Sequence, residues 1–339
     1  MRPTRKPCRV ALAPLLGQID VRFVVDRAVG IDHAGRRLLV ESGADVGFDR
    51  LVVATGSVLR RPPLPGAELA YSVDTQAEAV EFDRRLAEVA AQPTPSIAVV
   101  GAGFTGIELA LELRDRLAVH GGVAAGERAR LVLVDRAAAV GAELGPGPRP
   151  AIEAALAEAG VEVRLAAEIT ELGADRVAFA DGSALAVDAV VLATGLAAGP
   201  FGQHVPGERD ALGRIVADAF LRAPAAPHVF VTGDAAAADT GDGHLASQSC
   251  QHALRLGRYG GENAARDLLG LPLVAYTQLR YVTCLDLGRF GAVLTEGWDR
   301  VVKVSGAAAK PIKQRINTEV IYPPAGATGQ ELLDLSALE

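Results

Sequence analysis

The residues that most clearly carry chemistry form a glycine-rich loop, GAGFTG, at positions 101–106. The loop follows a short apolar run at 96–100, which predicts a buried strand, and precedes a helical pattern over 107–117. A second apolar run at 129–134 predicts the next strand, and Asp135 closes it. A glycine loop placed between a strand and a helix, with an acid after the following strand, favours a dinucleotide site over a glycine-rich turn without a ligand.

Each member of this pattern has a distinct expected role. Gly101 permits a tight turn, Gly103 lets the backbone approach a pyrophosphate, and Gly106 lets helix and strand pack closely. The N–H groups at the helix start then face the phosphates. Asp135 is placed to accept hydrogen bonds from a ribose 2′-hydroxyl, although it lies 34 residues after Gly101 (135 − 101), against the usual ~20. A polar loop at 120–128 absorbs part of the excess.

An internal repeat organises the elements around this loop. Residues 21–56 and 163–195 share one layout: β-rich runs separated by polar turns, ending in Ala-Thr-Gly. Each segment predicts a three-stranded antiparallel meander that leads into a buried strand, at 51–55 and at 189–193. The repeat indicates two copies of one domain.

The first copy lacks a counterpart of the glycine loop. Gly101 precedes Gly195 by 94 residues (195 − 101), and the same spacing before Gly56 falls ahead of the first residue. We therefore expect the first copy to lack its opening βαβ unit. Its strands at 51–55 and 229–232 would then lose the neighbour that they share in a doubly wound sheet.

The predicted fold class is α/β, with two Rossmann-like dinucleotide-binding domains, the first incomplete at its N-terminus, and a small C-terminal α+β segment. The first domain comprises residues 1–92 and 204–275, the inserted second domain 93–203, and the C-terminal segment 276–339. Further expected elements are a helix over 74–91, a hinge at 92–95, a strand at 228–232, a helix over 247–269, strands over 279–286 and 289–296, and a short helix near 306–315.

Composition excludes several classes of protein. The 339 residues are 50% apolar and 22% charged, as in ordinary globular proteins. The net charge of −7 argues against nucleic-acid binding. No apolar stretch of about 18 residues free of charge, Gly or Pro is present, so no membrane span is expected.

The cysteines and the N-terminus indicate a cytoplasmic protein. Cys8, Cys250 and Cys284 form no paired motif, which suits a reducing compartment. The basic N-terminus and the apolar run after it are like a signal peptide, but Pro14 interrupts the run and no cleavage site follows.

The sequence lacks the residues that several other kinds of chemistry require. Disulfide reduction needs a paired thiol and usually a histidine, and no histidine follows His252. The six histidines are scattered without ligand spacing, so no metal site is predicted. No GxSxG pattern is present.

The order of these motifs resembles a known superfamily. An ATG at 54–56, GAGFTGIE at 101–108, a second ATG at 193–195 and Gly-Asp at 233–234 resemble the two-dinucleotide-binding-domain flavoproteins of the pyridine nucleotide–disulfide oxidoreductase superfamily. Together with the run CLDLGR at 284–289, GAGFTGIE is most similar to type II NADH dehydrogenases. The resemblance covers nearly the whole chain and implies FAD in the first domain and NADH in the second.

The resemblance also implies roles for individual residues. Thr55 and Gly56 would line the flavin pocket, and Gly233 and Asp234 would meet the ribityl and phosphate region. NADH would be bound by Gly101, Gly103, Gly106 and Asp135, with Thr194 and Gly195 near the cofactor crossing.

Glu108 matches the glutamate that in these dehydrogenases lies near the flavin–nicotinamide contact, which makes it the candidate catalytic residue. Its place in the first helical turn has a second explanation, because the helix dipole stabilises a carboxylate there by roughly 0.3–1 kcal/mol. Both interpretations stay open.

Two features depart from the family pattern. Its quinone site carries two glutamines four residues apart, whereas this chain has Ser247 at the first position and only Gln251 at the second. The C-terminus, rich in Asp, Glu and Leu over 331–339, carries no basic amphipathic helix that would lie on a membrane.

The expected function is an FAD-dependent oxidoreductase that takes hydride from NADH and passes electrons to an acceptor such as a quinone, with Gln251 at the acceptor site. The alternatives are an NADH–ferredoxin or rubredoxin reductase and a flavin-free NAD-binding remnant or sensor. Asp135 favours NADH over NADPH, because its carboxylate would repel a 2′-phosphate. Arg136 argues against this preference, because an arginine there could accommodate the phosphate. The expected location is the cytoplasm, with a peripheral place at the inner face of the membrane as the alternative, and a homodimer stays open.

Overall fold

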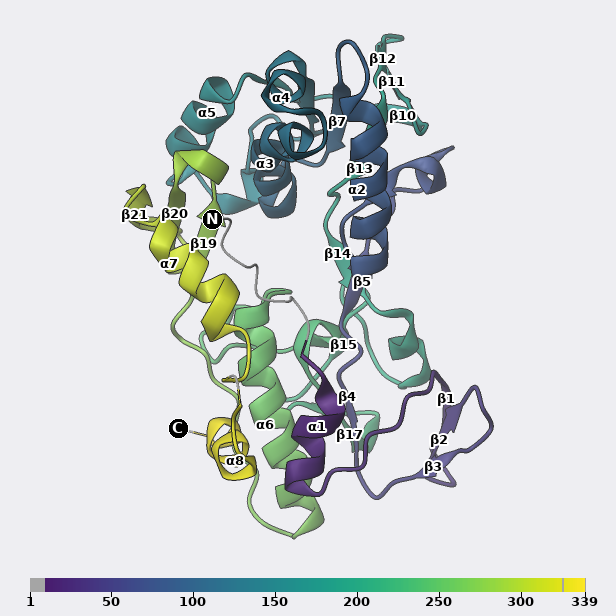
Figure 1. Ribbon diagram of the computed structural model, residues 1–339. Coiled ribbons are helices and arrows are strands. Elements are labelled where there is room, and N and C mark those ends of the chain that lie inside the picture. The colour runs from purple at the N-terminus through teal and green to yellow at the C-terminus, as the bar shows by residue number, and fades with distance from the viewer. Residues whose placement is uncertain (1–9, 325, 339) are drawn as a thin grey trace. The chain divides into compact units, whose positions relative to one another are not determined.

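The computed structural model describes residues 10–324 and 326–338 and divides into two compact units (Figure 1). Unit 1 contains the described chain up to Val58, Leu196–Leu279 and the described chain from Arg315 onward. Unit 2 contains Leu59–Gly195 and Arg280–Gln314. Each unit has a hydrophobic core of its own.

Unit 2 is built on a five-stranded parallel sheet with the order β6-β13-β7-β8-β9. The strands are β6 (Tyr71–Ser72), β13 (Ala189–Leu192), β7 (Ser96–Val100), β8 (Arg130–Val134) and β9 (Val161–Arg164). Val99 of β7 lies between Val191 of β13 and Leu133 of β8. The central strand thus carries the glycine loop, as in a dinucleotide-binding unit, and the three strands predicted for this sheet are confirmed.

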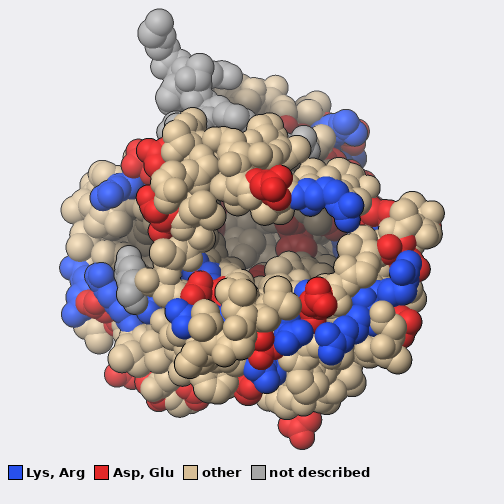
Figure 2. All heavy atoms as spheres, turned by 90° about the horizontal axis from the view of Figure 1, so that it is seen from below, with Lys and Arg blue, Asp and Glu red and all other residues tan. Residues whose placement is uncertain are grey.

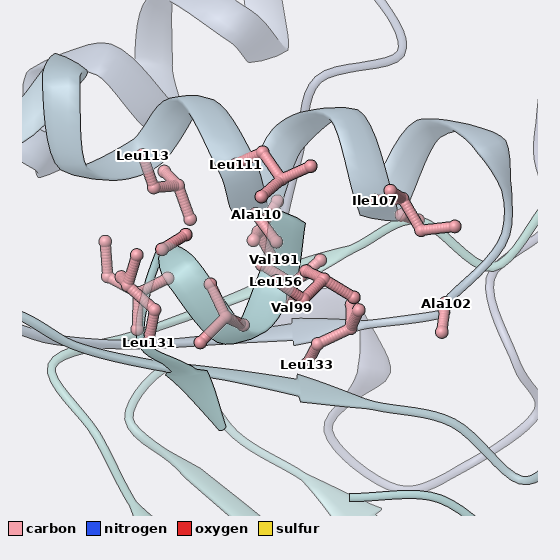
Figure 3. Close-up of a cluster of buried hydrophobic side chains, with 14 of the residues drawn as sticks. Val99, Ala102, Ile107, Ala110, Leu111, Leu113, Leu131, Leu133, Leu156 and Val191 are labelled. Carbon is pink, nitrogen blue, oxygen red and sulfur yellow. The ribbon is translucent and has the colours of Figure 1, made fainter. Parts of the chain in front are cut away.

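Side chains alternate along these strands and give the sheet two buried faces. One face packs against α3 (Phe104–Gly121) and α5 (Arg149–Glu158). Figure 3 shows α3 side chains over those of the strands: Ile107, Ala110 and Leu113 over Val99, Leu131, Leu133 and Val191. The other face packs against the second meander, β10 (Ile169–Leu172), β11 (Arg176–Phe179) and β12 (Ala184–Ala186), which confirms that meander.

Helix α2 (Gln76–Ala90) is joined to α3 by a partly exposed ionic contact. Asp83 on α2 accepts hydrogen bonds from Nε and Nη2 of Arg116 at 2.6 and 2.7 Å, and Nε2 of His120 lies 2.9 Å from the same carboxylate. The hydrogen bonds from Arg116, more than the contact with His120, lower the pKa of the Asp83 carboxyl to about 2.

Asp83→Asn is expected to lower the free energy of unfolding at neutral pH by roughly 0.5–1 kcal/mol, the range of a partly exposed pair. Because the folded pKa of about 2 lies below the unfolded value of about 3.9, the stabilisation is present above the unfolded pKa and is lost as pH falls through the folded one. Urea unfolding at neutral pH and near pH 3 measures the change. Asp115→Asn, at an exposed position of α3, is the control. An equal loss of unfolding free energy for Asp83→Asn at both pH values would contradict the assignment of a lowered pKa to Asp83.

A second, antiparallel sheet of unit 2 comes from the C-terminal part of the chain. It contains β19 (Val282–Asp286), β20 (Ala292–Glu296) and β21 (Val301–Gly306), and α7 (Lys310–Arg315) follows. The strands over 279–286 and 289–296 and the short helix were expected, whereas β21 was not.

The observed boundaries of the units differ from the expected ones. Residues 59–92 belong to unit 2 because β6 pairs with β13. Residues 280–314 belong there as well, because apolar side chains of β19 and β20 enter the core beneath α3. Periodicity identifies elements, but a domain boundary depends on which apolar faces meet.

Unit 1 contains the first meander and a small sheet. The meander, β1 (Ala28–Asp32), β2 (Arg37–Val40) and β3 (Val46–Gly47), is confirmed. The sheet has the order β16-β17-β4, with β16 (Arg222–Ala223), β17 (Ala226–Val231) and β4 (Leu51–Val53). Strands β17 and β4 are parallel and adjacent. No strand lies between them in the described part of unit 1, as expected, and the two strands pair directly with each other instead.

The remaining elements are short, apart from one long helix of unit 1. In unit 1 they include α1 (Leu12–Leu16), β14 (Leu196–Ala198), β15 (Ile215–Val216) paired with β18 (Ala236–Ala237), α6 (Cys250–Leu268), a π-helix (Ile316–Val320) and α8 (Gly329–Ser336). Strand β5 (Ser57–Leu59), which pairs with β14, contains the boundary between the units, and α4 (Val123–Arg128) lies in unit 2. The expected helix over 247–269 begins at Cys250 because Ser249 caps it. Acidic and basic side chains are interspersed over the face shown in Figure 2.

Candidate functional site

The glycine loop of unit 2 closes tightly on the end of β13. Gly101 has φ of +109°, and a Cβ there would lie 2.2 Å from the carbonyl oxygen of Ala193. A Cβ on Gly106 would lie 1.8 Å from the carbonyl oxygen of Gly101. Gly103 is the N-cap of α3 and gives no side-chain hydrogen bond to it. The first turn of α3 therefore presents backbone N–H groups at the open end of the loop.

Asp135 lies directly beside this loop. Its Oδ2 accepts a hydrogen bond from the Ala102 N–H at 2.6 Å, and its Oδ1 accepts one from the Ala137 N–H at 2.7 Å. The long spacing from Gly101 is explained by α4, a helix in the segment that the sequence indicated as a polar loop. The carboxylate thus holds the loop in shape, a role in addition to the expected contact with a ribose.

Thr194 and Gly195 lie at the same edge of the sheet. The Thr194 hydroxyl donates to the Arg60 carbonyl at 2.7 Å, and the Arg60 N–H donates to the Gly195 carbonyl at 2.9 Å. A Cβ on Gly101 would lie 3.2 Å from the Thr194 nitrogen. The structure therefore brings the second Ala-Thr-Gly against the glycine loop.

Glu108 on α3 takes part in an ion pair with α7. Its Oε1 lies 2.9 Å from Nζ of Lys313 and accepts a hydrogen bond from the Asp286 N–H at 2.8 Å. The Lys313 side chain is only 10% exposed, and its Nζ lies 5.3 Å from the centre of the Phe104 ring. Burial raises the pKa of the Glu108 carboxyl, and Lys313 opposes that shift. The expected place of Glu108 in the first helical turn was wrong, because α3 begins at Phe104 and its first turn contains no acidic residue. The helix dipole acts within the first turn and therefore does not account for this position.

A second charged pair lies next to the first. Asp286 forms an ion pair with Lys310, and its Oδ1 also accepts a hydrogen bond from the Gly288 N–H at 2.8 Å. Cys284, two residues earlier on β19, is a buried free thiol whose pKa is raised by burial. The sequence pointed to the run at 284–289 only through resemblance, and no local pattern indicated Lys310 or Lys313.

In unit 1, two strand ends meet at one edge of the parallel pair β4 and β17. Thr55 and Gly56 follow β4, and Gly233 and Asp234 follow β17. Asp234 Oδ2 accepts a hydrogen bond from the Ser57 hydroxyl at 2.7 Å. Ligands of doubly wound folds bind at such carboxyl ends of parallel strands.

The expected acceptor residue lies in the same unit. Gln251 is half-buried in the first turn of α6. Gln248, which precedes the helix, donates a hydrogen bond from its side-chain amide to the Asp234 carbonyl at 3.2 Å. The sequence patterns assigned no role to Gln248 or Ser57, although both residues are close in sequence to the expected motifs.

The histidines are less scattered in space than in sequence. Nδ1 of His33 lies 3.1 Å from Nε2 of His228, and Nε2 of His33 lies 2.8 Å from the His204 carbonyl oxygen. Within residues 10–324 and 326–338, no group of three or more His, Cys, Asp or Glu residues is arranged to hold a metal ion.

Comparison with known proteins identifies the family. Residues 11–257 match the pyridine nucleotide-disulphide oxidoreductase family. The chain belongs to this family. The resemblance drawn from the motifs, and the α/β fold with two Rossmann-like domains, are thereby confirmed.

Individual relatives agree with this assignment. The chain is 42% identical over 335 residues to an NADH dehydrogenase-like protein of Mycobacterium tuberculosis, covering 97% of this chain and 84% of the relative. It is 28% identical over 305 residues to a demethylphylloquinone reductase of Synechocystis sp., covering 87% and 73%. Among solved structures, the sulfide:quinone oxidoreductase of Aquifex aeolicus has a TM-score of 0.73 at 18% identity, covering 91% of this chain and 76% of that one.

As a member of this family, the protein is an oxidoreductase that uses FAD and NAD(H). The residues of unit 2 fit a dinucleotide, because its glycine loop leaves no room for side chains at Gly101 and Gly106, and because Gly103 provides no side-chain cap for the N–H groups at the start of α3. In unit 1, the residues expected to meet a flavin lie at the adjacent carboxyl ends of the parallel strands β4 and β17, which is where ligands of doubly wound folds bind. No helix in the described part of the chain is both long and apolar enough to cross a membrane.

Proposed function

We propose that this protein oxidises NADH and passes the electrons to a quinone. The observation that carries the proposal is the glycine loop of unit 2, closed on Ala193 and held by the Asp135 carboxylate. The quinone is supported by the likeness to a demethylphylloquinone reductase. The two described cysteines are free thiols, which suits work in the reducing cytoplasm.

Different residues of the chain bind NADH and FAD. The N–H groups at the start of α3 hold the NADH pyrophosphate, and Asp135 accepts hydrogen bonds from the adenosine ribose. In unit 1, Thr55, Gly56, Gly233 and Asp234 would hold FAD, and the Ser57 hydroxyl, which donates to the Asp234 carboxylate, would orient that side chain. FAD bound there would supply the chemistry that links a hydride donor to a two-electron acceptor, so that NADH is oxidised and the quinone, with two electrons and two protons, becomes a quinol.

Glu108 is the residue that we assign to proton handling. Burial raises the pKa of its carboxyl, and Lys313 lies 2.9 Å away. A carboxyl whose pKa is raised by burial, and which a neighbouring ammonium holds in place, is a candidate for proton transfer. Thr194 and Gly195 are hydrogen-bonded to Arg60, and the end of β13 that carries them lies against Gly101 of the loop.

The acceptor is tested with anaerobic enzyme reduced by one equivalent of NADH and then mixed with a soluble quinone or with a ferredoxin. Quinone is expected to reoxidise the flavin at least about tenfold faster, which is ~1.4 kcal/mol of barrier. Faster reoxidation by ferredoxin would support a ferredoxin reductase instead. A protein that binds NADH but shows no bleaching of a flavin would support a NAD-binding sensor.

Asp135→Ser is expected to weaken NADH binding on the order of tenfold and to narrow the preference for NADH over NADPH. The variant loses the acceptor for the Ala102 and Ala137 N–H groups, and it removes the charge that repels a 2′-phosphate. Dissociation constants from calorimetry measure both effects. Arg136→Ser, at the exposed neighbouring position, is the control and should weaken NADPH more than NADH. Equal affinity of the parent protein for both nucleotides would contradict the role of Asp135.

A further inference from the structure

One acidic side chain reaches the phosphate loop from outside the dinucleotide motif. Glu143 lies in a short turn of 3-10 helix, Ala142–Leu144, which follows β8. Its Oε1 accepts a hydrogen bond from the Phe104 N–H at 3.3 Å. A Cβ placed on Gly103 would lie 2.5 Å from the same oxygen. The carboxylate therefore lies against the start of α3.

The backbone keeps this turn close to the loop. The Gly141 N–H donates to the Ala102 carbonyl at 2.8 Å, and Leu144 is buried in the core of unit 2. The Glu143 side chain itself is exposed to solvent. The carboxylate can thus leave the loop while the main chain that carries it stays in place.

Glu143 occupies the place that a phosphate needs. Gly103 supplies no side-chain cap, so the first N–H groups of the 18-residue helix α3 would otherwise face water. A carboxylate at a helix start is stabilised for the same reason as a phosphate. The Phe104 N–H cannot serve both anions fully, and the two negative groups repel each other.

We propose that Glu143 is a displaceable cap of the phosphate loop that sets how tightly the protein binds its nucleotide. It holds the start of α3 before the nucleotide arrives and moves aside when the pyrophosphate binds. The inference rests on the proposed nucleotide site and adds to it a residue that opposes binding. It follows that affinity for phosphate-bearing ligands is lower than the loop alone would give.

The test compares Glu143→Gln with Glu158→Gln, which removes the same charge from an exposed position of α5. Calorimetry with the full-length protein measures the dissociation constants of NADH, ADP and adenosine. Glu143→Gln is expected to lower the constants of NADH and ADP about two- to fivefold, the effect of one charge at a helix start. The constant for adenosine, which has no phosphate, is expected to stay unchanged, as are all three constants in Glu158→Gln.

A second measurement separates displacement from a general change in charge. Without nucleotide, Glu143→Gln is expected to lower the melting temperature relative to Glu158→Gln, because a neutral amide caps the start of α3 less strongly than a carboxylate. The gain in affinity should shrink at high salt. Unchanged or weaker NADH binding by Glu143→Gln overturns the inference, since Glu143 would then be neutral or would assist the bound nucleotide. Absence of NADH binding by the parent protein overturns the proposed nucleotide site, and the inference falls with it.

Discussion

Gly106→Ala is expected to abolish tight NADH binding and to destabilise unit 2. The new Cβ would lie 1.8 Å from the Gly101 carbonyl oxygen and 3.3 Å from Cβ of Ala193. The helix would have to move away from the loop, because neither atom belongs to a flexible side chain. We expect the affinity for NADH to fall by more than about tenfold and the free energy of unfolding to fall by about 1–3 kcal/mol, the usual cost of overpacking.

Calorimetry and urea unfolding measure the two effects of Gly106→Ala. Gly261→Ala is a matched control, because Gly261 also lies within a helix, α6, but a Cβ there meets nothing within 4 Å. This control should bind NADH normally and gain roughly 0.5–1 kcal/mol of stability from the higher helix propensity of alanine. Normal NADH binding by Gly106→Ala would show that the loop does not need its close approach to α3.

Glu108→Gln is expected to slow turnover at least about tenfold, ~1.4 kcal/mol of barrier, while NADH affinity stays near that of the parent. Glutamine keeps an acceptor for the Asp286 N–H but cannot exchange a proton or neutralise Lys313. Because Lys313 is only 10% exposed, an unpaired charge there also costs stability, by about 2–3 kcal/mol. Steady-state kinetics and urea unfolding measure the two losses.

A double variant separates catalysis by Glu108 from its structural role. Lys313→Met alone should destabilise the protein, and Glu108→Gln combined with Lys313→Met should recover most of the stability, because both charges of the pair are gone. Turnover should stay low in the double variant if the Glu108 carboxyl handles protons. Recovery of turnover together with stability would assign Glu108 a structural role only.

The sequence by itself determined the elements whose signals are local. The strand, glycine loop and helix at 96–117 follow from an apolar run, from glycines that permit close backbone approach, and from helical periodicity within one short segment. Both meanders follow in the same way from turn residues between β-rich runs. Strand β21 and helix α8 were missed, although Thr328 and Glu331 form a capping box that marks the start of α8.

The contacts between distant segments were decided only by the tertiary structure. Glu108 and Asp286 are 178 residues apart along the chain, and His33 and His228 are 195 apart, yet each pair is in hydrogen-bond contact. The Glu143 carboxylate at the start of α3 is a contact of the same kind. Periodicity reports which face of an element is apolar, but it does not report which face of another element will cover it. The packing of the buried faces determines which distant side chains come into contact. It therefore also determines which polar residues are partners in a site.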